Sequence, residues 1–309
     1  MIRLLLLAAA WMLAGGQATP PVPSQAPPDT DIFLASLSIA GGAVGVGPPV
    51  NVTAHAGYDN QPSFTPDGRA ILFASDRDAD PSAPALRRTD IYKYDIDSKR
   101  ITRLTTTPEG EFSPTITPDG RHISAIRVET DGTQRLWQFT LDGKKPELVF
   151  PEIKPVGYHA WADERRVVLY VLGDPPTLQL ADVLSGHGSV IARGVGRSIQ
   201  RIPGFRTMSF VERRIASDAD GAPRLVIREL DPETTQMATL VEAVKGATEA
   251  DVAWMPDRTL LMAYDGALYA WQKGDAGWKK AVDLTALGLK GVTRIAVSPK
   301  GDRLALVAQ

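Results

Sequence analysis

Short apolar runs alternate with turn sequences along most of the chain. Ile71–Ala74 is continuously apolar, Ile91–Tyr94 alternates apolar and polar positions, and Ile101–Thr105 is rich in β-branched residues. Runs of this length and composition are typical of β-strands. No stretch shows the periodicity of an amphipathic helix over three turns. The pattern therefore predicts an all-β protein.

A repeated turn sequence divides the chain into units. Its clearest copies are Phe64-Thr65-Pro66-Asp67-Gly68-Arg69 and Ile116-Thr117-Pro118-Asp119-Gly120-Arg121, and weaker copies lie at Asp163, Pro203, Pro256 and Pro299. In such turns proline presets φ and glycine accepts a positive φ. The copies are 40 to 53 residues apart, which is the range of β-propellers with one four-stranded blade per repeat. Six copies, of which the one at Pro203 is placed mainly by spacing, predict six blades.

The two ends of the chain are expected to complete one blade together. After Pro299 there is room only for one more strand, Arg303–Ala308, so the last repeat lacks its outer pair. Near the other end, Asp31-Ile32-Phe33 parallels Asp90-Ile91-Tyr92, and Val52-Thr53 parallels Leu104-Thr105. We therefore predict a six-bladed β-propeller over residues 31–309, in which residues 31–53 pair with the C-terminal blade and close the ring.

The N-terminus has the features of an export signal. Arg3 precedes an apolar run, Leu4–Leu13, and Gly16-Gln17-Ala18 places small residues before a cleavage point. The run is too short to span a bilayer comfortably, although an uncleaved anchor is the alternative. We predict a signal peptide over residues 1–18, a proline-rich linker over residues 19–30, and no stable membrane span after cleavage. The expected location is the periplasm or the outside of a bacterial cell.

Composition narrows the chemistry. The formal net charge is −2 and the isoelectric point is near 6.1, which does not indicate a nucleic-acid partner because the phosphate backbone requires a basic surface. The chain has no cysteine, so disulfides, thiolate metal sites and a cysteine nucleophile are excluded. His55, His122, His159 and His187 are not spaced as metal ligands. We predict no metal and no cofactor.

The repeat resembles the TolB family of propellers. The resemblance rests on the Pro-Asp-Gly-Arg turns, on Ser75-Asp76-Arg77-Asp78, on Asp90-Ile91-Tyr92 and on Arg103-Leu104-Thr105. It is good over residues 59–149, moderate from Asp251 onward and poor between Pro151 and Leu240. TolB carries an additional domain before its propeller, and we expect that domain to be absent here. Related repeats form the propeller of prolyl oligopeptidases, and no hydrolase domain is expected after the last blade.

Six residues are candidates for a binding site at one mouth of the channel. In a propeller the segment from one blade to the inner strand of the next opens onto the channel. These segments carry three acids and several bases, and the candidate set is Asp59, Glu111, His159, Arg197, Glu249 and Arg294, with Arg201 on the same segments. Three carboxylates beside basic groups could bind a peptide, a cation or a sugar. No catalytic residue is assigned.

The aromatic residues have a simpler interpretation. Phe64, Trp161 and Trp254 occupy the same inner-strand position, which predicts packing between blades. Trp271 and Trp278 lie near lysines in the fifth blade, where they could stack on a sugar, but packing is the favoured interpretation.

Two hypotheses about function follow. The first is a non-enzymatic scaffold in the cell envelope that binds a protein or peptide partner through loops on a rigid ring. The alternative is a propeller enzyme (a hydrolase, lyase or lactonase) that acts on a sugar derivative in the central channel.

Overall fold

A computed structural model describes residues 28–79, 88–215 and 223–309 of the chain. Within these residues every helix or strand element is a β-strand, as the sequence predicts. The signal peptide and most of the linker predicted for the N-terminus lie outside the described residues. No helix capable of crossing a bilayer occurs in the described part of the chain.

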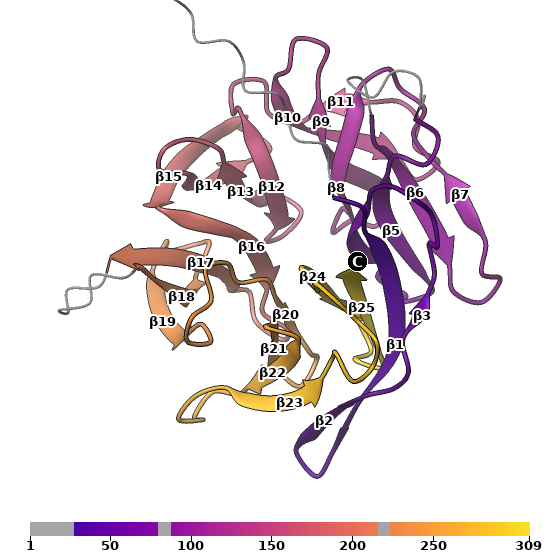
Figure 1. The fold of residues 1–309 in the computed structure, drawn as a ribbon. Helices are drawn as coiled ribbons and strands as arrows, with labels where there is room; N and C mark the ends of the chain where they lie inside the picture. Colours follow the sequence, from indigo (N-terminus) through magenta and orange to yellow (C-terminus); the bar gives the residue numbers. More distant parts are fainter. Residues whose placement is uncertain (1–27, 80–87, 216–222) are drawn as a thin grey trace, which may run out of the picture.

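Six antiparallel sheets form a closed ring (Figure 1). Five of them consist of four consecutive strands. Blade 1 contains β4 (Asp59–Phe64), β5 (Ala70–Ser75), β6 (Asp90–Asp95) and β7 (Ile101–Arg103). Blade 2 contains β8 (Gly110–Ile116), β9 (His122–Val128), β10 (Gln134–Thr140) and β11 (Glu147–Leu148). Blade 3 contains β12 (Val156–Trp161), β13 (Arg166–Val171), β14 (Thr177–Asp182) and β15 (His187–Arg193). Blade 4 contains β16 (Val195–Arg201), β17 (Met208–Ile215), β18 (Pro223–Leu230) and β19 (Met237–Glu242). Blade 5 contains β20 (Val252–Trp254), β21 (Leu260–Tyr264), β22 (Ala267–Trp271) and β23 (Lys279–Asp283).

Blade 6 joins the two ends of the chain and confirms the predicted closure. Its inner strands are β24 (Arg294–Val297) and β25 (Arg303–Ala308), and its outer strands are β1 (Asp31–Ala40), β2 (Ala43–Val46) and β3 (Val50–Asn51). β1 pairs with β25 from Asp31 opposite Ala308 to Ser36 opposite Arg303. The predicted equivalence of Thr53 and Thr105 is also confirmed, because their hydroxyls accept from the amides of Ile32 and Ile91 at 2.9 and 2.8 Å.

The hairpin of β1 and β2 was not predicted. β1 continues beyond its pairing with β25 and turns back through β2, where Leu37 pairs with Val46. Val44 is buried in a cluster with Leu268 and Leu284 of blade 5. The N-terminal segment therefore ties blade 6 to its neighbour as well as closing the ring.

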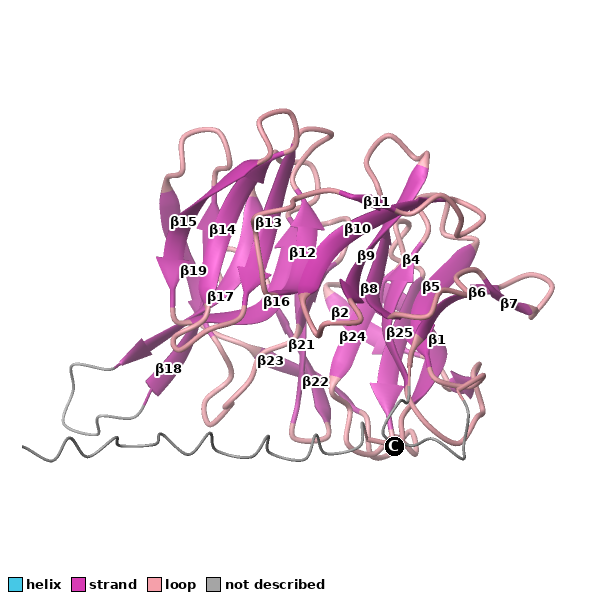
Figure 2. Cartoon of the chain, turned by 90° about the horizontal axis from the view of Figure 1, so that it is seen from above, coloured by secondary structure: helices cyan, strands magenta, loops and turns pink. Residues whose placement is uncertain are grey.

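The repeated turns are held by side chains that the sequence specifies locally. In the first, the amide of Gly68 donates to the carbonyl of Thr65 at 2.8 Å, and Gly68 has a φ of 70°. The carboxylate of Asp67 accepts from the Thr65 hydroxyl at 2.6 Å and from the Arg69 amide at 3.0 Å. The same contacts recur at Thr117, Asp119 and Gly120. In the edge-on view the connecting loops gather on the two faces of the ring (Figure 2).

The core lies between blades, and the predicted aromatic packing is confirmed. Trp254 is buried between blades 4 and 5, in the same cluster as Trp271, with Trp278 packed against that cluster. Phe64 and Trp161 pack against clusters between neighbouring blades but are only half-buried, because their other side lines the channel.

Candidate functional site

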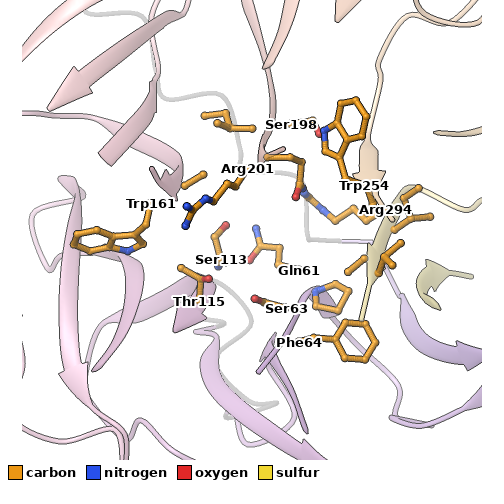
Figure 3. A pocket seen from close by; sticks show the side chains of 18 of the residues that line it. Gln61, Ser63, Phe64, Ser113, Thr115, Trp161, Ser198, Arg201, Trp254 and Arg294 are labelled. Atoms are coloured by element: carbon orange, nitrogen blue, oxygen red, sulfur yellow. Dashed lines mark hydrogen bonds between the residues drawn. The ribbon is translucent and has the colours of Figure 1, made fainter. Parts of the chain in front are cut away.

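The central channel forms a cavity that is lined by all six blades. Its volume is about 680 Å³, and its wall comes from the inner strands and the turns that follow them. The residue five positions before the turn lines it in every blade, and all six are polar or charged: Gln61, Ser113, Tyr158, Ser198, Asp251 and Arg294. Figure 3 shows Gln61, Ser113, Ser198 and Arg294 around the opening. The channel therefore has a polar wall on a rigid ring.

β-Bulges decide which residues face the channel in blades 1 and 2. In β4, Asn60 pairs with Ala74 but Ser63 pairs with Leu72, so one extra residue is inserted between the two pairs. Gln61, in the bulge, has a φ of 59°, which is uncommon for a residue other than glycine. Because an extra residue exchanges the two faces of a strand, Asp59 does not share the channel-facing side of Ser63.

β8 contains the same bulge. Phe112 pairs with Ile126 and Thr115 with Ser124, and Ser113 between them has a φ of 52°. The side-chain oxygen of Gln61 accepts from the Ser113 amide at 2.7 Å. This contact links the bulges of blades 1 and 2 across the channel wall.

Asp59 lies inside blade 1 and does not line the channel. It is fully buried, and both its carboxylate oxygens accept from the Arg77 guanidinium at 3.0 Å. That guanidinium lies over the rings of Phe73 and Tyr92, 5.3 and 5.1 Å from their centroids. Asp59 is therefore one half of an ion pair within the blade.

Glu111 repeats this arrangement in blade 2. It is fully buried, and its carboxylate accepts from the Arg127 guanidinium at 3.2 Å and from the Thr107 hydroxyl. Arg127 lies 4.4 Å from the ring centroid of Trp137. Burial raises the pKa of Glu111 to about 7, against the opposing effects of Thr107 and Arg127.

The structure thus corrects the expectation that Asp59, Glu111 and Glu249 converge at one mouth. The first two are buried in ion pairs, and the Glu249 carboxylate is 70% exposed and lies outside the cavity lining. Within the described residues, no three His, Asp or Glu side chains are grouped closely enough to hold a metal ion.

The three basic candidates do line the channel, and two of them have acidic partners. A guanidinium nitrogen of Arg197 lies 3.2 Å from the Glu249 carboxylate. Arg294 lies 3.7 Å from the carboxylate of Asp251 and donates to the Tyr158 hydroxyl at 2.7 Å. Asp251 and Tyr158 were not among the site residues predicted from the sequence. Their common position five residues before the turn is the signal that identifies them.

His159 lines the channel, and its ring is hydrogen-bonded to the buried Ser124. Its Nε2 lies 2.8 Å from the Ser124 hydroxyl, which also accepts from the Trp161 indole at 2.8 Å. The Nδ1 atom of His159 is buried and has no partner in the described part of the chain. Burial lowers the pKa of His159 to about 3, so the ring is neutral near pH 7.

This depressed pKa predicts a stability change in acid. Between pH 6.5 and pH 3 the unfolded chain protonates His159 and the folded chain does not, so folding loses stability as the pH falls. Between pH 7.5 and pH 5, the free energy of unfolding measured in urea should fall by at most about 2 kcal/mol more in the wild type than in His159→Gln. His187→Gln, at an exposed position, is the control and should follow the wild type. If the difference in the free energy of unfolding between wild type and His159→Gln does not change with pH, the pKa of His159 is not lowered in the folded protein.

Comparison with known proteins supports the fold. No protein-family model and no curated protein sequence matches the chain. A structure assigned as TolB from Agrobacterium tumefaciens superposes with a TM-score of 0.62 at 14% identity, covering 91% of this chain and 99% of that one. TolB from Acinetobacter baumannii gives 0.54 at 14% identity, covering 90% of this chain, which spans only 64% of that protein. A chain of a nidogen/laminin complex gives 0.56 at 11% identity, with 91% and 98% covered.

These identities establish the fold alone. The resemblance to TolB seen in the repeat sequence is confirmed at that level by an all-β ring of six blades with its ends joined in one blade. The chain therefore has the fold of a six-bladed β-propeller, similar to the propellers of the TolB structures.

Proposed function

We propose that this chain is an exported, non-enzymatic binding module whose central channel takes an extended peptide segment of a partner protein in the bacterial cell envelope. The observation that carries the proposal is the polar channel of about 680 Å³ enclosed by six blades. Clefts of this size on rigid scaffolds are typical of binding sites. Export is supported by the N-terminal sequence.

The groups along the wall suit a peptide backbone. Hydroxyl and amide side chains are distributed around the channel, among them Ser63, Thr115, Gln200 and Ser298. Such groups both donate and accept hydrogen bonds, as do the amides and carbonyls of an extended chain. Prolines of five turns also line the cavity and offer apolar contacts: Pro66, Pro118, Pro203, Pro256 and Pro299.

The alternative, an enzyme acting on a sugar derivative, has less support. In the described part of the chain, a serine–histidine contact at the channel joins Ser124 and His159. Ser124 is fully buried and is not part of the cavity lining. Its hydroxyl positions the ring of His159 and the indole of Trp161, and it is not presented to a ligand as a nucleophile.

A selection from a library of random peptides tests the proposal. The wild-type protein should enrich specific peptides, and Ser63→Trp should not, because the indole would fill the channel at a lining position. Ser189→Trp places the same side chain on the exposed outer strand β15 and should enrich the same peptides as the wild type. Both variants are first checked for wild-type melting. Equal enrichment by Ser63→Trp, or no enrichment by any of the proteins, would refute peptide binding in the channel.

A further inference from the structure

Arg201 stands at a position that is apolar in the other five blades. Two residues before the turn the blades carry Phe64, Ile116, Trp161, Arg201, Trp254 and Val297. Arg201 ends the inner strand β16 and lines the channel. Blade 4 therefore brings a guanidinium to a level of the wall that is otherwise aromatic or aliphatic.

Arg201 lines the channel and has no acidic partner within the described residues. The lining contains three arginines and one aspartate. Arg294 is matched by Asp251, and Arg197 by Glu249 at the rim. Arg201 is exposed and makes no ion pair or side-chain hydrogen bond in the parts of the chain that are described. The channel therefore retains one uncompensated positive charge.

The guanidinium is directed into the open channel. Figure 3 shows its side chain extending toward the space between Trp161 and Ser113. The Ser113 hydroxyl has no hydrogen-bond partner within the described residues. A guanidinium offers a planar set of donors that matches a carboxylate, and its field is focused inside a walled channel. These features suit an anionic group entering the channel.

We propose that Arg201 forms a subsite for a carboxylate, and that the occupant is an acidic side chain of the bound peptide. This inference rests on the proposed function. A peptide is favoured over an acidic sugar because the aromatic rings of the lining are at most partly exposed, which leaves little ring face for a sugar to stack on. Trp254 is buried with its indole nitrogen donating to Ser209, and the indole of Trp161 donates to Ser124. Phe64 and Trp161 reach the channel with one side only, and the hydroxyl and amide side chains of the lining, among them Gln200, suit a peptide backbone.

Binding of capped peptides tests the subsite. The probes are hexaglutamate and hexaglutamine, each acetylated and amidated so that only side chains carry charge, together with trigalacturonate. Affinities are measured by calorimetry with wild type, Arg201→Gln and Arg201→Lys. Arg100→Gln is the matched control, since Arg100 is exposed on the outer side of blade 1 and its loss changes the net charge equally.

We expect hexaglutamate to bind the wild type more tightly than hexaglutamine does. Arg201→Gln should weaken hexaglutamate binding about 10- to 100-fold, the range for a lost charged hydrogen bond. Hexaglutamine should be unaffected by that change, Arg201→Lys should recover part of the affinity, and Arg100→Gln should match the wild type. Added salt should weaken hexaglutamate binding selectively.

Three outcomes would overturn the inference, and they are distinguishable. Equal binding of both peptides, unchanged in Arg201→Gln, would remove the carboxylate subsite and leave peptide binding in place. Binding of trigalacturonate alone, lost in Arg201→Gln, would replace the peptide with an acidic sugar. Absence of binding by all three probes, together with an unsuccessful library selection, would reject the proposed function itself.

Discussion

Replacing Arg77 with methionine is expected to lower the free energy of unfolding by about 3–5 kcal/mol, the cost of leaving a buried charge without its partner. Asp59 is fully buried and both its oxygens depend on the Arg77 guanidinium. Methionine keeps much of the packing on Phe73 and Tyr92 but offers no donor. The carboxylate must then ionise in a low-dielectric site or take up a proton.

A double-mutant cycle in urea separates the charge from the packing. Arg77→Met and Asp59→Asn are measured singly and together. The double variant should recover most of the stability lost in Arg77→Met, because no buried charge remains. If Arg77→Met has the same urea midpoint of unfolding as the wild type, Asp59 does not depend on the Arg77 ion pair.

The burial of Asp59 and Glu111 makes them unsuitable positions for a test of binding. Substitutions of Asp59 or Glu111 would disturb the interiors of blades 1 and 2 before they changed any channel surface. Loss of a partner in such a variant would therefore report misfolding. Arg201 and Ser63, which line the channel, are the informative positions.

Removing residues 1–53 is expected to prevent folding of the ring as a monomer. β1 covers β25, in which five of six residues are buried, and it contributes the buried side chains of Ile32 and Leu37. Each such side chain contributes roughly 1.5–3 kcal/mol when buried. Together with the lost backbone pairing, the loss is comparable to the whole free energy of unfolding of a typical domain, roughly 5–15 kcal/mol. The truncation also exposes the long edge of β25, which promotes aggregation.

Complementation distinguishes closure from a general effect of truncation. The truncated chain should show no cooperative melting transition, and a synthetic peptide of residues 28–56 added during refolding should restore one. A peptide in which Ile32 is replaced by aspartate should fail, since Ile32 is fully buried between blades 6 and 1. A truncated chain that melts cooperatively as a monomer would show that the ring does not need its N-terminal strands.

The sequence by itself determined the all-β class, the number of blades and the closure of the ring. These features depend on local chemistry that recurs in each unit. Pro66-Asp67-Gly68 and Pro118-Asp119-Gly120 specify their turns through their own side chains and φ preferences. Even blade 4, whose turn is eroded around Pro203, was located because the neighbouring repeats set the spacing.

Only the tertiary structure decided which side chains reach the channel. Simple alternation places Asp59 and Ser63 on one face of the strand, and the bulge at Gln61 separates them. The bulge is stabilised by the neighbouring blade, since Gln61 bonds to the backbone of Ser113, and no local sequence pattern reports such a contact. The partners of the arginines were hidden for the same reason.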